Sequence, residues 1–187
     1  MQRLSVVIPI KNSPSLEVFI KGNLRLLENN EVIVVDSGGG EQLEKLSTKY
    51  VKKDVSFWEA RKLGYAHVST QYILNLDCDV VVPEGYVEDA LALLRNKADA
   101  VSIFYEDVNH CQGALEYGVS MWKTEVLREL YDFSMDKVMD GRIVKVGSMA
   151  YSTLHNGWCE CTYMWRKLKL SGRKLETLPY RAKHLKP

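Results

Sequence analysis

The stretch Tyr72-Ile73-Leu74-Asn75-Leu76-Asp77-Cys78-Asp79 places two carboxylates directly after an apolar run. The run has the length and aliphatic content of a buried β-strand. Burying an ionised carboxylate without a partner costs roughly several kcal/mol, or the group stays protonated. A pair of carboxylates at the end of a strand therefore indicates an electropositive binding partner, either a divalent cation or a network of sugar hydroxyls. Mg²⁺ and Mn²⁺ suit such a pair, because they leave their remaining positions to phosphates and water. The alternative is that Asp77 and Asp79 only cap a turn or the next helix.

The composition is that of one globular domain covering residues 1–187, with 46% hydrophobic and 26% charged residues. A net charge of +1 gives no electrostatic reason to expect nucleic acid as a partner. No apolar segment approaches the roughly 20 residues needed to span a bilayer, and the start of the chain is not a signal peptide, so we expect a cytoplasmic protein without a transmembrane segment. The four cysteines have no disulfide-framework spacing, and we expect free thiols at Cys78, Cys111, Cys159 and Cys161.

Strands and helices alternate through the first part of the chain. Apolar periodicity predicts strands over 4–10, 31–35, near 51, 71–76 and 98–104, and helices over 14–28, 43–50, 57–68 and 83–96. Ser56 and Glu59 form a predicted capping box at the start of one helix. This alternation predicts an α/β fold with a mostly parallel central sheet and helices on both faces.

Ligands of such sheets bind beyond the carboxyl ends of the strands. Those ends carry Asn12, Asp36 and the Asp77/Asp79 pair, and we expect these side chains to converge on one crevice. The second part of the chain is less regular, with predicted helices over 124–130 and 159–170, a strand over 174–178 and a basic tail over 180–187. No repeat or linker divides the chain, so we expect one domain with a nucleotide-binding half, 1–104, and a more variable half, 105–187.

Several motifs occur in a specific order between the first strand and His184. They are Ser5-Val6-Val7-Ile8-Pro9, then Val34-Val35-Asp36-Ser37-Gly38, then Glu59-Ala60-Arg61-Lys62-Leu63-Gly64 one helix before Asp77-Cys78-Asp79. Together they resemble the family-2 glycosyltransferases of the GT-A fold, and the chain looks like a minimal, archaeal or viral member (a viral one would act in the host cytoplasm). The resemblance implies an enzyme that uses Mn²⁺ or Mg²⁺ to move a sugar from a UDP- or GDP-sugar to an acceptor hydroxyl, with inversion. The acceptor would be a glycan, a protein or a lipid-linked molecule.

The resemblance also implies which residues bind the nucleoside diphosphate sugar. Pro9, Ile10 and Asn12 would line the nucleoside pocket. Asp36 would accept a hydrogen bond from the base imide, and Arg61 would reach the base or the phosphates. The alternatives are that Asp36 only caps the helix after Gly40 and that Arg61 is a solvated charge on a helix face.

The metal-binding and donor-binding carboxylates follow from the same resemblance. Asp77 would contact the ribose, Asp79 would ligate the metal, and Cys78 lies between them in the donor site. Asp77 and His184 are further candidate metal ligands. The alternative for His184 is a solvated residue in the basic tail.

The catalytic base is where the chain departs from the family pattern. Inverting members carry an acidic pair that opens a helix, and here Glu160 holds the first position while Cys161 holds the second. We expect Glu160 to deprotonate the acceptor hydroxyl, with Asp140 and Asp136 in reserve. The alternative for Glu160 is a helix N-terminal carboxylate favoured by the helix dipole.

Two other enzyme classes fit the residues less well. A nucleotidyltransferase would need a glycine-rich loop after the first strand, where Lys11-Asn12-Ser13-Pro14 stands. A dinucleotide-dependent dehydrogenase would need G-x-G-x-x-G there, whereas Gly38-Gly39-Gly40 follows the second strand. A catalytically degenerate GT-A domain that binds a sugar nucleotide or a glycan stays open because of Cys161.

Overall fold

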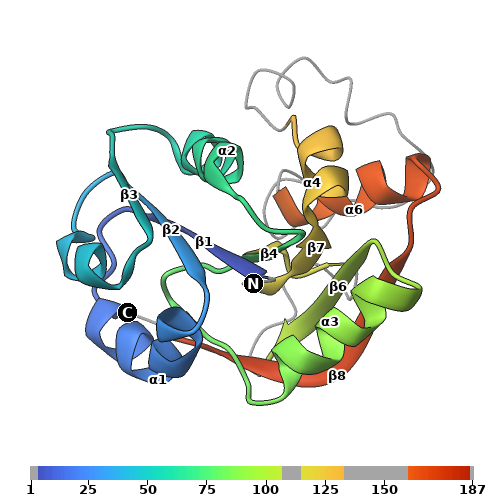
Figure 1. Ribbon diagram of the computed structural model, residues 1–187, viewed down its shortest axis with the longest axis horizontal. Coiled ribbons are helices and arrows are strands. Elements are labelled where there is room, and N and C mark those ends of the chain that lie inside the picture. The colour runs from blue at the N-terminus through green and yellow to red at the C-terminus, as the bar shows by residue number, and fades with distance from the viewer. Residues whose placement is uncertain (1–3, 107–114, 133–159, 186–187) are drawn as a thin grey trace.

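The computed structural model describes residues 4–106, 115–132 and 160–185, and in these residues eight strands form one sheet (Figure 1). Their order across the sheet is β3-β2-β1-β4-β7-β6-β8-β5. The strands are β1 (Leu4–Ile10), β2 (Glu31–Asp36), β3 (Lys49–Lys52), β4 (Tyr72–Asn75), β5 (Val80–Val81), β6 (Ala100–Tyr105), β7 (Met121–Lys123) and β8 (Leu175–His184).

The sheet is mostly parallel, as predicted. β1 pairs in parallel with β2 on one side and β4 on the other, and β2 pairs in parallel with β3. β7 is antiparallel to both β4 and β6, β8 is parallel to β6, and β5 is antiparallel to β8. Only β7 and β5 therefore run against the other strands of the described sheet. Every residue of β1 is buried, which is why this strand reads as an almost unbroken apolar run.

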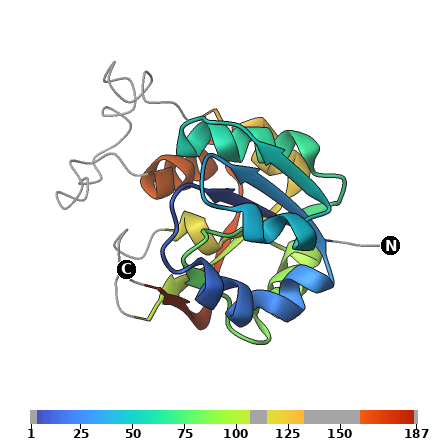
Figure 2. The same cartoon turned by 90° about the vertical axis from the view of Figure 1, so that its left-hand side faces the viewer.

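Helices cover both faces of the sheet. They are α1 (Leu16–Glu28), α2 (Phe57–His67), α3 (Tyr86–Asn96), α4 (Thr124–Leu130) and α6 (Glu160–Leu170). Val6 and Ile8 of β1 pack with α1 and α3 in one core, whereas Val7, which points to the other face, packs in a second core with α2, α4 and α6. Figure 2 shows α1 and α2 on opposite sides of the first strands.

Local sequence determines where α2 begins. The Ser56 hydroxyl accepts a hydrogen bond from the Glu59 N–H, and the Glu59 carboxylate accepts one from the Ser56 N–H at 3.0 Å. This confirms the predicted capping box, which satisfies two of the free N–H groups at the helix start. The same helix carries Arg61 toward the ends of β1 and β4.

The predicted C-terminal tail is wrong. β8 continues to His184, because its second part pairs with β6 as far as Ala182 and with β5 at Lys183 and His184. The short strands β5 and β7 were also absent from the prediction. None of the helices in the described part of the chain is long and apolar enough to cross a membrane.

Candidate functional site

A pocket of about 230 Å³ lies beyond the carboxyl ends of β1 and β4. Four segments line it: the β1–α1 loop, the start of α2, the turn after β4 and the residue after β8. The lining residues are Lys11, Asn12, Ser13, Pro14, Ser15, Phe57, Asp77, Cys78, Asp79 and Leu185. A larger groove of about 700 Å³ runs between α1 and the start of α3, but its described lining contains none of the predicted site residues. The smaller pocket is therefore the candidate site.

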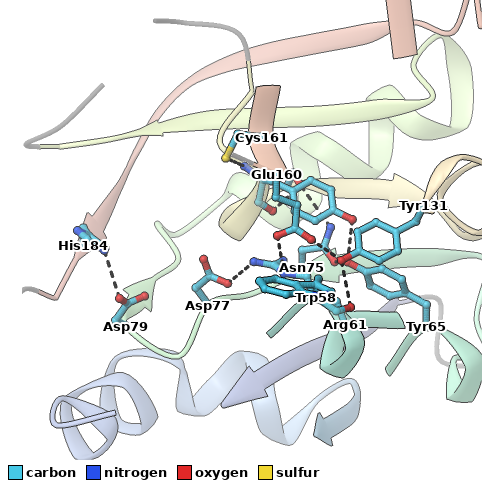
Figure 3. A network of polar contacts seen from close by, with 12 residues as sticks. Trp58, Arg61, Tyr65, Asn75, Asp77, Asp79, Tyr131, Glu160, Cys161 and His184 are labelled. Carbon is cyan, nitrogen blue, oxygen red and sulfur yellow. Dashed lines mark hydrogen bonds and ion pairs between the residues drawn. The ribbon is translucent and has the colours of Figure 1, made fainter. Parts of the chain in front are cut away.

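Backbone contacts fix the turn that carries the two carboxylates. The Asp77 N–H donates to the Gly118 carbonyl at 2.8 Å, and the Ser13 hydroxyl donates to the Cys78 carbonyl at 3.1 Å. The side chains of Asp77 and Asp79 are 25% and 40% exposed. Figure 3 shows them pointing apart, Asp77 toward Arg61 and Asp79 toward His184.

Asp79 and His184 face each other across the β5–β8 pairing. Asp79 Oδ2 lies 3.3 Å from His184 Nε2, and the Leu185 N–H donates to the Asp79 carbonyl at 2.6 Å. The imidazole is stacked on Tyr105, with ring centroids 5.1 Å apart. The structure thus brings together two of the three predicted metal ligands.

A carboxylate and an imidazole are suitable ligands for Mn²⁺. Within residues 4–106, 115–132 and 160–185, no three His, Cys, Asp or Glu side chains gather closely enough to hold a metal ion by themselves. Asp79 and His184 therefore fit an ion that takes its other ligands from diphosphate oxygens and water, which is how small divalent cations are commonly held beside nucleotides.

Asp77 belongs to a buried ion network instead. Arg61 is 2% exposed, and its Nη2 lies 2.6 Å from Asp77 Oδ1 while its Nε lies 3.0 Å from Glu160 Oε2. The guanidinium lies over the rings of Phe57 and Tyr117, 4.7 and 4.8 Å from their centroids. A buried cation needs such partners, because removing it from water is costly.

The charges in this network shift the pKa values of its members. Burial alone would lower the pKa of Arg61, but the Asp77 and Glu160 carboxylates raise it well above its usual value. Burial raises the pKa of the Asp77 carboxyl, and the neighbouring Arg61 opposes that shift. The predicted contact of Arg61 with a nucleotide stays a prediction, since the guanidinium is engaged with carboxylates of this chain.

Glu160 is the first residue of α6, and its side chain is 13% exposed. Besides its ion pair with Arg61, it accepts a hydrogen bond from the Tyr131 hydroxyl. The next residue, Cys161, accepts a hydrogen bond through Sγ from the Tyr117 N–H at 3.3 Å. The reserve bases Asp136 and Asp140 lie outside the described residues.

The predicted nucleoside-binding residues are divided between the pocket and the core. Asn12 lines the pocket and adopts a positive φ of 51°, whereas Ile10 and Asp36 are buried and Pro9 is buried inside β1. Asp36 Oδ1 accepts a hydrogen bond from the Gly38 N–H at 2.7 Å, and Oδ2 accepts one from the Tyr50 hydroxyl. Burial and the Asp36 carboxylate raise the pKa of Tyr50 above its usual value.

Sequence comparison decides the family. A family model described as Glycosyl transferase family 2 matches residues 5–151, which is most of the 187-residue chain. The chain belongs to glycosyl transferase family 2. The GT-A fold predicted for it is confirmed, and the chain is thus a member of a glycosyltransferase family.

A solved structure shares the fold of this family-2 member. It is the crystal structure of S. aureus TarS 1–349, which matches with a TM-score of 0.64 and 14% sequence identity. The alignment covers 98% of this chain and 60% of the TarS chain, so the family-2 chain spans about three fifths of the length of that structure. A search of curated proteins gave no significant match.

Sequence reasoning missed several residues of this family-2 site. Phe57 lines the pocket and packs on Arg61, and their spacing of four residues on one helix could have indicated the contact. Gly118 lies so close to Asp77 that a Cβ there would be 2.0 Å from Oδ2. The contacts of Tyr117 and Tyr131 depend on tertiary packing, and nothing in the local sequence marks them.

Proposed function

We propose that this family-2 chain transfers a sugar from a UDP- or GDP-sugar to an acceptor hydroxyl, with a divalent metal ion and with inversion at the anomeric carbon. The observation that carries the proposal is the Asp79–His184 pair, of which Asp79 lines the pocket beyond the strand ends. Such a location is the usual ligand site of parallel α/β sheets. The family match supports the reaction class.

On the donor side, Asp79 and His184 would hold Mn²⁺ or Mg²⁺, with Asp77 beside them. A bound divalent ion offsets the negative charge that grows on the diphosphate as it leaves. Asn12 and its loop line the same pocket and would contact the nucleoside. Pro9, Ile10, Asp36, Arg61 and Cys78 stay the predicted donor-site residues, and all of them except Cys78 would act from buried positions.

On the acceptor side, Glu160 is the proposed base. Its carboxylate would take the proton of the acceptor hydroxyl while that oxygen forms its bond to the anomeric carbon and the bond to the diphosphate oxygen breaks. The partly exposed carboxylate at the start of α6 supports this role. Asp136 and Asp140 remain the reserve candidates.

A second candidate function is a sugar-nucleotide or glycan-binding module without turnover. The contacts of Glu160 and Cys161 favour it. Glu160 forms an ion pair with Arg61 and accepts a hydrogen bond from Tyr131, and Cys161 accepts one from the Tyr117 N–H. The two functions differ in one property only. An enzyme loses turnover in Glu160→Gln, whereas a binding module shows no turnover in the unaltered protein.

Calorimetric titration of UDP and of GDP tests the donor site. Each titration is made with Mn²⁺ and with a chelator, on the wild type and on Asp79→Ala. We expect binding that needs both the metal and Asp79. Binding of neither nucleotide under any condition would refute the proposed donor.

A further inference from the structure

We propose that Arg61 is a positioning residue that couples the donor carboxylate Asp77 to the proposed base Glu160. This inference rests on the proposed function, because it assigns those two carboxylates to the donor and acceptor sides of one reaction. Arg61 itself is 2% exposed, so it acts through the two carboxylates. The guanidinium joins three elements, α2, the turn after β4 and α6, that are far apart in the sequence.

The two ion pairs use different nitrogens of the guanidinium. Nη2 lies 2.6 Å from Asp77 Oδ1, and Nε lies 3.0 Å from Glu160 Oε2. The planar guanidinium donates a hydrogen bond to Asp77 and forms an ion pair with Glu160 from another nitrogen, whereas a lysine ammonium is a single point charge on a flexible stem. The orientation of one carboxylate therefore depends on that of the other.

The surroundings leave the guanidinium little freedom to move. The rings of Phe57 and Tyr117 lie 4.7 and 4.8 Å from Cζ of Arg61. Cation–ring contacts of this kind are strongest away from water. Arg61 is thus held in place by apolar packing while its polar edge faces two carboxylates.

The far sides of both carboxylates are also fixed. The second oxygen of Glu160 accepts a hydrogen bond from the Tyr131 hydroxyl, and Asp77 Oδ2 packs against Gly118. Tyr117 precedes Gly118, and its N–H donates a hydrogen bond to the sulfur of Cys161, which follows Glu160. A displacement of either carboxylate is therefore transmitted to the other through Arg61 and along this segment.

The coupling accounts for Cys161 at the second position of the acidic pair. The sulfur accepts the Tyr117 N–H, which holds the start of α6 against the loop that packs on Asp77. The Glu160 position is then maintained by Arg61, Tyr131 and this contact together. None of these contacts requires a second carboxylate at position 161.

The first test measures nucleotide affinity with Mn²⁺ in Arg61→Met and Arg61→Lys. We expect Arg61→Met to weaken binding of the nucleotide that the wild type prefers by about 10- to 100-fold, the loss expected when a charge-assisted hydrogen bond that orients a binding residue is removed. Arg61→Lys should recover part of this loss. Because Arg61 acts through Asp77, the double variant Asp77→Asn/Arg61→Met should bind no more weakly than Asp77→Asn alone.

Arg128→Met is the matched control for lost stability. Arg128 also makes several hydrogen bonds, to the Tyr65 and Val68 carbonyls, but it contacts neither carboxylate of the network. We expect it to lower Tm while leaving nucleotide affinity unchanged. Equal losses of affinity in Arg61→Met and Arg128→Met would overturn the inference, as would multiplicative effects of Asp77→Asn and Arg61→Met.

The second test needs no nucleotide. The Tm of the ligand-free protein is measured for Arg61→Met, Glu160→Gln and the double variant, and we expect the two shifts to be clearly non-additive because the side chains are in contact. Additive shifts would overturn the coupling whatever the nucleotide titrations show. If the wild type binds neither nucleotide, the proposed donor site fails, whereas the Tm shifts still decide the coupling: non-additive shifts support it and additive shifts overturn it.

Discussion

Gly118 lies against the Asp77 carboxylate, and we predict that Gly118→Ala disrupts nucleotide binding. A Cβ at this position would lie 2.0 Å from Asp77 Oδ2 and 2.6 Å from Cγ. Opening the first distance to 3.0 Å requires a movement of about 1 Å, twice the roughly 0.5 Å within which a binding geometry must be held. The 2.6 Å contact between Asp77 and Arg61 would not survive this displacement.

The magnitude follows from the contacts that are lost. Overpacking costs about 1–3 kcal/mol of stability, which for a chain of this size lowers Tm by about 2–12 °C. A hydrogen bond to a charged group contributes about 1.5–3 kcal/mol, so its loss from the site should weaken nucleotide binding by about 10- to 150-fold. Calorimetry with UDP, GDP and Mn²⁺, well below the lowered Tm, measures this change.

Gly172→Ala is the control substitution. Gly172 has a φ of +69°, and a Cβ there would have no neighbour within 4 Å. The backbone strain of about 1–2 kcal/mol should lower Tm by an amount similar to that of Gly118→Ala, without any change in affinity. The reasoning is refuted if Gly118→Ala binds nucleotide as tightly as the wild type, or if the control loses affinity to the same extent.

Three further predictions concern stability and the metal site. Hydrogen bonds from Ser5 and Ser69 lower the pKa of Glu31, although burial alone would raise it, so Glu31→Ala should cost about 1.5–3 kcal/mol at pH 7. The difference in unfolding free energy between the wild type and Glu31→Ala should be present above about pH 4.5 and disappear as the pH falls through the lowered pKa. Urea unfolding at pH 7 and pH 3 measures it, and an equal difference at both pH values would exclude the Glu31 carboxylate as its cause. Ser56→Ala should remove the cap of α2 and lower Tm by about 2–4 °C, and an unchanged Tm in calorimetric scans would argue against the cap. His184→Ala should weaken Mn²⁺-dependent nucleotide binding by about tenfold or more and leave binding in chelator unaffected; a loss that is equal in both conditions would exclude His184 as a partner of Asp79 in holding the ion.

Local patterns in the sequence were sufficient for most of the fold. The unbroken apolar run of β1 and the capping box at Ser56 are local features, and both predictions agree with the structure. The strand that ends in His184 was predicted too short because half-buried and exposed residues alternate along it, so it lacks the apolar run of a central strand. β7 is only three residues long, and its pairing with β4 depends on the whole sheet.

The part of the candidate site that lies in local sequence patterns was predictable. Asp77 and Asp79 follow directly from the end of an apolar run, and family resemblance indicated His184. The partners of Arg61 could not be predicted, because an arginine on an amphipathic helix is usually solvated, whereas this one is buried by contacts with Tyr117 and Glu160, which are distant in the sequence. Likewise, the local sequence gives no indication that Tyr50 occupies one oxygen of Asp36.

The contacts that close the site join very distant parts of the chain. Asp79 and His184 are 105 residues apart, and Arg61 and Glu160 are 99 residues apart, whereas β1 and β2 follow each other closely. Contacts between distant residues carry a larger loop-closure entropy and tend to form late in folding. Local opening of α6 or of the end of β8 would therefore dismantle the site while β1, β2 and β4 keep their structure. Loss of function on heating should then precede global unfolding. Amide exchange in α6 and at the end of β8 should be faster than in the central strands.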